Sequence, residues 1–236
     1  MKPKKPRNIL KIIAGVIIFL TLPSILFFGF LYFKYNEELP VGIQGYEADA
    51  LAKKMLVALD YEAYKNTNHI EWTFKKRRHY NWNKAKNICE VYWKDYKVIL
   101  DLNDYSQSRV YIHGFKNESD MTDDLIEKAI KYYNKDSFWL VAPYKIFDEG
   151  TLRQIVKTEH NKNALLVTYT PDDSYLWLLD DNNKPIAFKM WTSLLPIDGL
   201  EASWNNWTVT ESGAQLPTFH KFMFFGLEIS DIKGIE

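Results

Sequence analysis

Five histidines, one cysteine and several adjacent acidic pairs are the side chains of this 236-residue chain that could carry chemistry. The histidines show no H-x-x-x-H or H-E-x-x-H spacing, which would place two imidazoles on one helix face as zinc ligands. They are dispersed along the chain, at His69, His79, His113, His160 and His220. The sequence therefore predicts no metal site and no cofactor.

The acidic pairs fall where local structure already explains them. Turns or a helix start contain the pairs Asp123–Asp124, Asp172–Asp173 and Asp180–Asp181, and aspartate is favoured at both kinds of position. The chain also lacks the G-x-S-x-G elbow, the phosphate-binding P-loop and the G-x-G-x-x-G fingerprint. We therefore expect no catalytic residues and no enzymatic activity, with an unrecognised hydrolase as the third alternative.

Two further groups have simple structural interpretations. Cys89 alternates with Val91 and Trp93 in a predicted strand, which indicates a buried, unreactive thiol. A single cysteine allows no intrachain disulfide, so the core must hold the fold. The basic run Lys75–Arg78 predicts a solvated strand edge that discourages aggregation, with a contact to anionic lipid or a partner as the alternative.

An apolar segment near the N-terminus indicates on which side of a membrane the rest of the chain is located. Ile12–Phe33 contains 22 residues without a charge, about 33 Å of helix, enough to cross the hydrocarbon core of a bilayer. Basic residues precede it and no acidic residue occurs before Glu37, so residues 1–11 are predicted to be a cytoplasmic tail. No small-residue cleavage site follows, which favours an uncleaved signal anchor over residues 12–35 rather than a removed signal peptide.

This anchor predicts a single-pass protein of the inner (cytoplasmic) membrane, with its domain on the periplasmic or extracytoplasmic side. Residues 36–236 carry a net charge of −6, because six of the 30 basic residues and none of the 30 acidic residues precede residue 36. An excess of negative charge disfavours binding to nucleic acid.

The pattern of the remaining chain predicts one β-rich domain. A connector over residues 36–45 leads to predicted helices at Tyr46–Leu59, Tyr61–Tyr64 and Thr122–Tyr133. From His69 the hydrophobic period changes to two, as in half-buried strands. Further strands are predicted at Arg77–Trp82, Ile88–Trp93, Tyr96–Leu102, Arg109–His113, Thr151–Thr158, Ala164–Thr170, Tyr175–Asp180, Pro185–Thr192, Glu201–Thr210 and Phe219–Ile229. The predicted fold class is mainly β (α+β): over residues 46–236, one curved antiparallel sheet or open half-barrel with two or three helices on its concave side.

Two segments resemble a known family. The first is the aromatic run Phe138–Lys145, interpreted as a strand. The second begins with the hairpin of Leu176–Asp180 and Pro185–Lys189 and continues to Trp204–Trp207 and Leu216–Pro217. They resemble the LolA-like (lipoprotein-carrier-like) exported proteins, in particular an uncharacterised Bacteroidetes-type group. The resemblance implies an unclosed sheet that wraps a helical lid and takes acyl chains in its concave space.

The resemblance and the aromatic content together suggest an apolar ligand site, with a lipid or an acylated protein as partner. The residues expected to line it are Phe138, Leu140, Leu165, Val167, Leu176, Leu178, Phe188 and Met190. The alternative is a structural or protein-interaction module of the cell envelope with a filled core. In either case Trp72, Trp93, Trp139 and Trp177 are expected to be buried.

Overall fold

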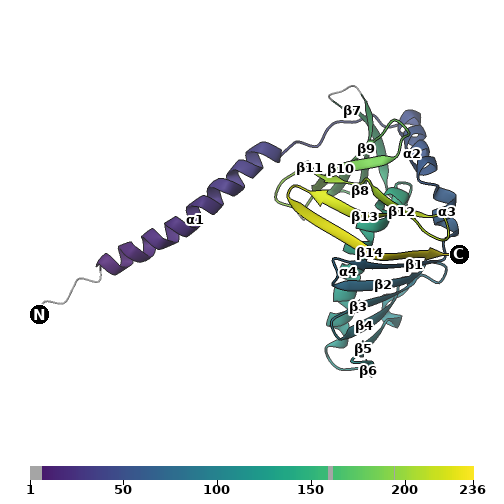
Figure 1. Ribbon diagram of the computed structural model, residues 1–236, viewed down its shortest axis with the longest axis horizontal. Coiled ribbons are helices and arrows are strands. Elements are labelled where there is room, and N and C mark those ends of the chain that lie inside the picture. The colour runs from purple at the N-terminus through teal and green to yellow at the C-terminus, as the bar shows by residue number, and fades with distance from the viewer. Residues whose placement is uncertain (1–6, 159–161, 194) are drawn as a thin grey trace, which may run out of the picture.

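The computed structural model describes residues 7–158, 162–193 and 195–236. His160 and the basic residues before Arg7 therefore lie outside the described residues. Helix α1 (Arg7–Tyr35) extends away from the domain (Figure 1). Among the described residues, one helical stretch, Leu10–Tyr35, is long and apolar enough to cross a membrane.

The domain is built on one large antiparallel sheet of 14 strands. The strands are β1 (His69–Phe74), β2 (Arg78–Asn83), β3 (Ile88–Trp93), β4 (Tyr96–Asp101), β5 (Arg109–Ile112), β6 (Phe115–Asn117), β7 (Leu152–Lys157), β8 (Asn163–Thr170), β9 (Asp173–Leu179), β10 (Pro185–Thr192), β11 (Leu200–Ser203), β12 (Asn206–Val209), β13 (Gln215–Phe222) and β14 (Phe225–Ile235). Their order is β6-β5-β4-β3-β2-β1-β14-β13-β11-β10-β9-β8-β7, with β12 paired to β13. The predicted open antiparallel sheet is confirmed, but it has more strands than a half-barrel and does not close.

Three helices pack on one face of this sheet. They are α2 (Tyr46–Ala58), α3 (Tyr61–Asn66) and α4 (Thr122–Val141), and 3-10 turns occur at Tyr105–Gln107 and Ala142–Lys145. Helix α4 contacts β4, β5 and β13, whereas α2 contacts β7 and β8. Buried side chains of all three helices and of the sheet strands belong to one hydrophobic core. Figure 1 shows α4 crossing the part of the sheet that contains β1–β5.

Helix α4 corrects one prediction from the sequence. The aromatic run that begins at Phe138 was expected to be a strand, but α4 continues to Val141 and a 3-10 turn follows. Leu125, Ala129, Tyr133 and Leu140 are among its buried positions, and this spacing continues one largely apolar helical face. The aromatic residues have high strand propensity, but packing against the sheet determined their conformation.

The connector after α1 is docked on the domain. The Glu37 amide donates to the Asp198 carbonyl at 3.0 Å, and the Trp191 indole donates to the Glu37 carbonyl at 2.9 Å. The Lys189 ammonium contacts the Glu37 carboxylate at 2.6 Å. Ile43 forms an antiparallel bridge with Ile155 of edge strand β7. These contacts fix the connector against β7, β10 and the loop that precedes β11.

Candidate functional site

The helix-covered face of the sheet contains most of the side chains expected to line a ligand site. Leu140, Leu165, Val167 and Phe188 are fully buried there, and Met190 is buried as well. Phe138 is partly buried against the same core. Strands β8 and β10 and helix α4 bring these six together, and their packed side chains form a continuous interior.

Leu176 and Leu178 do not belong to this group. They pack in a smaller cluster with Val156, Leu166 and Trp191, whereas Tyr175 and Trp177 of the same strand face the helices. Since successive side chains of a strand point to opposite faces, the expectation that these two leucines line the interior is wrong. Strand β9 is apolar on both faces, so its sequence shows no polar alternation to indicate which side faces the helices.

The tryptophan predictions are largely confirmed. Trp72, Trp93 and Trp177 are buried, and Trp139 of α4 is partly buried. Trp204, whose burial was not predicted, is fully buried among aromatic rings. Its centroid lies 4.2 Å from His220, 5.0 Å from Phe188 and 6.2 Å from Trp139. It follows β11, outside any regular alternation that could have marked it.

Several indole N–H groups in this interior lack a hydrogen-bond acceptor. Among the described residues, the buried Nε1 atoms of Trp72, Trp82, Trp93 and Trp204 have no acceptor. A buried donor without an acceptor costs about 1–3 kcal/mol. Trp72, Trp82 and Trp93 lie on adjacent strands β1, β2 and β3, so three unsatisfied donors are present in one apolar layer beneath α4.

One buried ion pair joins α4 to the sheet. Arg78 Nε contacts Asp136 Oδ2 at 2.5 Å, and Arg78 Nη2 donates to Oδ1 at 3.1 Å. The Tyr80 hydroxyl also donates to Oδ2, at 2.5 Å. Burial raises the pKa of the Asp136 carboxyl, and the hydrogen bonds from Arg78 and Tyr80 oppose this rise without cancelling it. Arg78 was expected at a solvated edge, which is wrong: its side chain is 18% exposed and bridges to α4.

His220 on β13 makes a second polar contact with α4. Its Nε2 lies 2.8 Å from the Trp139 carbonyl oxygen, and its Nδ1 lies 2.8 Å from that of Ser203. Burial lowers the pKa of His220 to about 4, although both carbonyl groups act in the opposite direction. Together, Asp136 and His220 place polar contacts at two points along an otherwise largely apolar contact between helix and sheet.

We expect this histidine to make the domain less stable in acid. Between about pH 6.5 and pH 4, the unfolded state binds a proton that the folded state excludes, so the free energy of unfolding falls as pH falls, by about 3 kcal/mol from pH 7 to pH 4. Urea unfolding of the full chain in detergent at several pH values measures this slope. A His220→Phe variant is expected to lack this component; an identical slope in both proteins would contradict the prediction.

Cys89 is a free, fully buried thiol, as the sequence predicted. Burial raises its pKa, which lowers the thiolate population and therefore its reactivity. Within the described ranges, no group of three or more histidine, cysteine, aspartate or glutamate side chains is placed to hold a metal ion.

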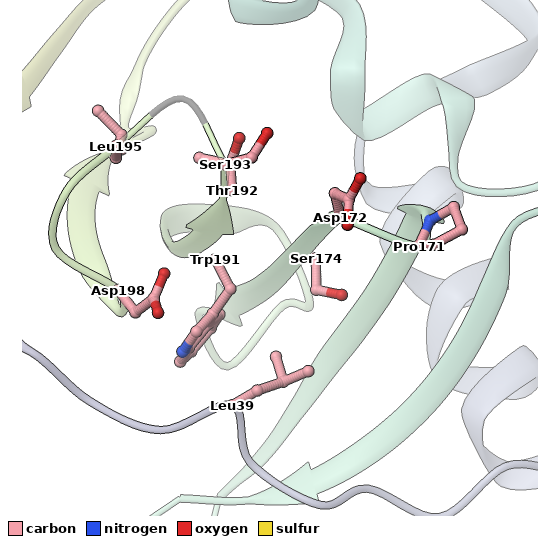
Figure 2. Close-up of a pocket in the computed structure, with 9 residues that line it drawn as sticks. All are labelled: Leu39, Pro171, Asp172, Ser174, Trp191, Thr192, Ser193, Leu195 and Asp198. Carbon is pink, nitrogen blue, oxygen red and sulfur yellow. The ribbon is translucent and has the colours of Figure 1, made fainter.

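Open recesses occur on the surface of the described part of the domain, and three of them bear on ligand binding. Figure 2 shows the first, about 430 Å³, where Leu39 of the connector and Trp191 and Ser174 of the sheet lie close together. A second, of about 310 Å³, contains Lys75, Lys76, Arg77, Gly226 and Glu228. A third, of about 450 Å³, lies between α2 and α3. None of the three is lined by a residue predicted for the ligand site.

Comparisons with known proteins give one finding. Among solved structures, the chain is similar to a LolA superfamily protein from Nitrosomonas europaea, with 10% sequence identity and a TM-score of 0.33. The match covers 84% of this chain and 95% of that one. No family model matches the chain, and no curated protein sequence matches it.

Proposed function

We propose that this chain is a membrane-anchored, extracytoplasmic and non-catalytic binding or carrier domain for an apolar ligand, either a lipid or the acyl group of a lipoprotein. The site is the interior between the sheet and α4. The observation that carries this proposal is the set of buried indole donors without acceptors in that apolar interior. An ester or carboxyl oxygen attached to an acyl chain would supply the missing acceptor.

Occupation of this site requires α4 to move outward. Side chains of the helix and the sheet fill the space, including the fully buried Trp72, Trp204 and Phe188. An acyl chain can replace contacts that α4 makes with the sheet, because each buried CH₂ contributes about 0.8 kcal/mol. Ten carbons would contribute about 8 kcal/mol before the cost of association. The Arg78–Asp136 ion pair, the Tyr80–Asp136 hydrogen bond and the His220 contact are among the polar interactions that such a movement must break.

The filled interior also favours a second candidate function. A domain that keeps this core closed is a structural or protein-interaction module of the cell envelope. The two candidates differ in one measurable property, since a carrier binds acyl chains at a saturable interior site and an interaction module does not.

The test uses the purified full-length chain in detergent, titrated with a fatty acid and its methyl ester, each brominated on the acyl chain. We expect saturable quenching of tryptophan fluorescence at one site. Removing one hydrogen bond of about 1 kcal/mol, in Trp93→Phe, should weaken binding about fivefold. Trp191→Phe, on the opposite face of β10, is the matched control and should bind as the wild type does. Quenching that never saturates would reject the carrier and leave the interaction module.

A further inference from the structure

We propose that the turn between β13 and β14, residues Phe222–Phe225, enters the outer leaflet of the membrane, and that the neighbouring turn Lys75–Arg77 binds anionic lipid headgroups. The inference rests on the membrane anchor of the proposed function and adds a lipid-binding surface distinct from the interior site. Four features of the structure support it.

The first feature is a contact between the β13–β14 turn and the apolar helix. The ring centroid of Phe224 lies 6.2 Å from that of Phe27 in α1. Phe27 precedes Lys34 by about two helical turns, or about 10 Å along the axis. If α1 spans the bilayer with Lys34 at the headgroups, Phe27 lies in the outer leaflet. A side chain in contact with Phe27 must lie there as well.

The second feature is the exposure of this turn. Phe224 is 61% exposed and Phe225 58% exposed, with ring centroids 4.8 Å apart. Two adjacent, exposed aromatic rings at the end of a hairpin leave a large apolar surface in water. In the outer leaflet the same surface is buried, which makes insertion favourable.

The third feature is the basic turn beside it. The Lys75 amide donates to the Glu228 carbonyl at 2.9 Å, so the turn between β1 and β2 is bound to the start of β14. The ammonium of Lys76 lies 3.2 Å from the carboxylate of Glu228. Lys75 and Arg77 make no ion pair within the described part of the chain and line the recess of about 310 Å³. This recess therefore offers positive charge to an anionic headgroup.

The fourth feature is the distance between the two groups. Glu228 is three residues beyond Phe225 on β14, about 10 Å along an extended strand. The headgroup region of a bilayer is about 5–7 Å thick on each side of the hydrocarbon core. The strand spacing thus suits aromatic rings among the acyl chains with the lysines at the level of the phosphates. Phe115, the first residue of β6, follows the turn between β5 and β6 at the same ends of the strands and is 79% exposed.

The test places a fluorophore at single introduced cysteines of the full chain, reconstituted in phosphatidylcholine vesicles that contain phosphatidylglycerol. Cys89 is buried and does not compete for the label. The labelled variants are Phe224→Cys, Phe27→Cys within α1, and Val209→Cys as the matched control. Val209 is also apolar and exposed, and it pairs with Gln215 at the opposite end of β13. Nitroxides on lipid acyl chains and iodide in water serve as the two quenchers.

We expect nitroxide quenching at positions 27 and 224, and iodide quenching at position 209. Quenching of position 224 by iodide, with position 27 still quenched by lipid, would overturn this inference and leave the anchor intact. Loss of lipid quenching at position 27 would instead reject the anchor, and this inference with it. A label at position 224 shielded from both quenchers would show that protein, such as a second copy, covers the turn, and would also overturn the inference.

The headgroup site has its own measurement with the label at position 224. Nitroxide carried by phosphatidylglycerol should quench severalfold more than the same nitroxide carried by phosphatidylcholine at equal mole fraction. The triple variant Lys75→Gln, Lys76→Gln, Arg77→Gln should lose this preference. The variant Lys84→Gln, Lys86→Gln, in the turn at the other end of β2, should keep it. Equal quenching by the two lipids in the wild-type chain would overturn the headgroup assignment.

Discussion

Replacing Trp204 by alanine is expected to lower the free energy of unfolding of the domain by about 3–5 kcal/mol. The side chain is fully buried and contacts the rings of Trp139, Trp177, Phe188 and His220. Its removal leaves a cavity that rings from β9, β10, β13 and α4 cannot all move to fill. The loss is a large share of the about 5–15 kcal/mol that stabilises a typical domain.

Urea unfolding of the full chain in detergent, followed by far-ultraviolet circular dichroism, measures this effect. Tyr46→Ala is the control, because Tyr46 is an aromatic residue that is 87% exposed. Its effect should stay within about 0.5 kcal/mol. A Trp204→Ala midpoint equal to that of the wild type would show that this aromatic cluster does not hold β9, β10, β13 and α4 together.

The second large effect is expected at the ion pair between α4 and the sheet. Arg78→Met leaves the Asp136 carboxylate buried without its charged partner, and breaking a buried pair on one side costs about 3–5 kcal/mol. The deficit should be largest near neutral pH. It should shrink as pH falls through the raised pKa of Asp136, because protonation removes the unpaired charge.

Two variants separate charge from packing in that experiment. The double variant Arg78→Met, Asp136→Leu removes both charges and should recover most of the lost stability. Lys131→Met breaks the exposed pair with Glu127 on the same helix and should change stability by less than about 0.5 kcal/mol. A deficit in Arg78→Met that is independent of pH would show that the loss comes from packing alone.

Local sequence patterns determined much of the architecture. The uncharged run that predicts a spanning segment lies within α1. This segment could be predicted because the length and hydrophobicity of a helix are properties of consecutive residues. Strands β1–β4 lie where the period-two pattern placed them, within a residue or two at each end. In these strands one face is buried and the other is partly exposed, so burial is visible as alternation.

The predicted strand Glu201–Thr210 is divided into β11 and β12, the predicted strand Phe219–Ile229 contains the turn between β13 and β14, and the short β6 was missed. Short strands carry too few residues to show a period. Their positions depend on the neighbours with which they pair.

Features that depend on long-range contacts were decided only by the tertiary structure. Arg78 belongs to a basic run, yet its partner Asp136 lies 58 residues away on α4. Leu176 and Leu178 could not be assigned to a face, because β9 is apolar on both sides. The contact between Phe27 and Phe224 joins two ends of the chain. The sequence by itself determined the apolar segment long enough to span a membrane and most of the helical and extended segments, because neighbouring residues encode these properties, whereas the end of α4 and the short strands depended on packing. The folded chain alone decided which side chains meet, because those contacts depend on how distant segments pack.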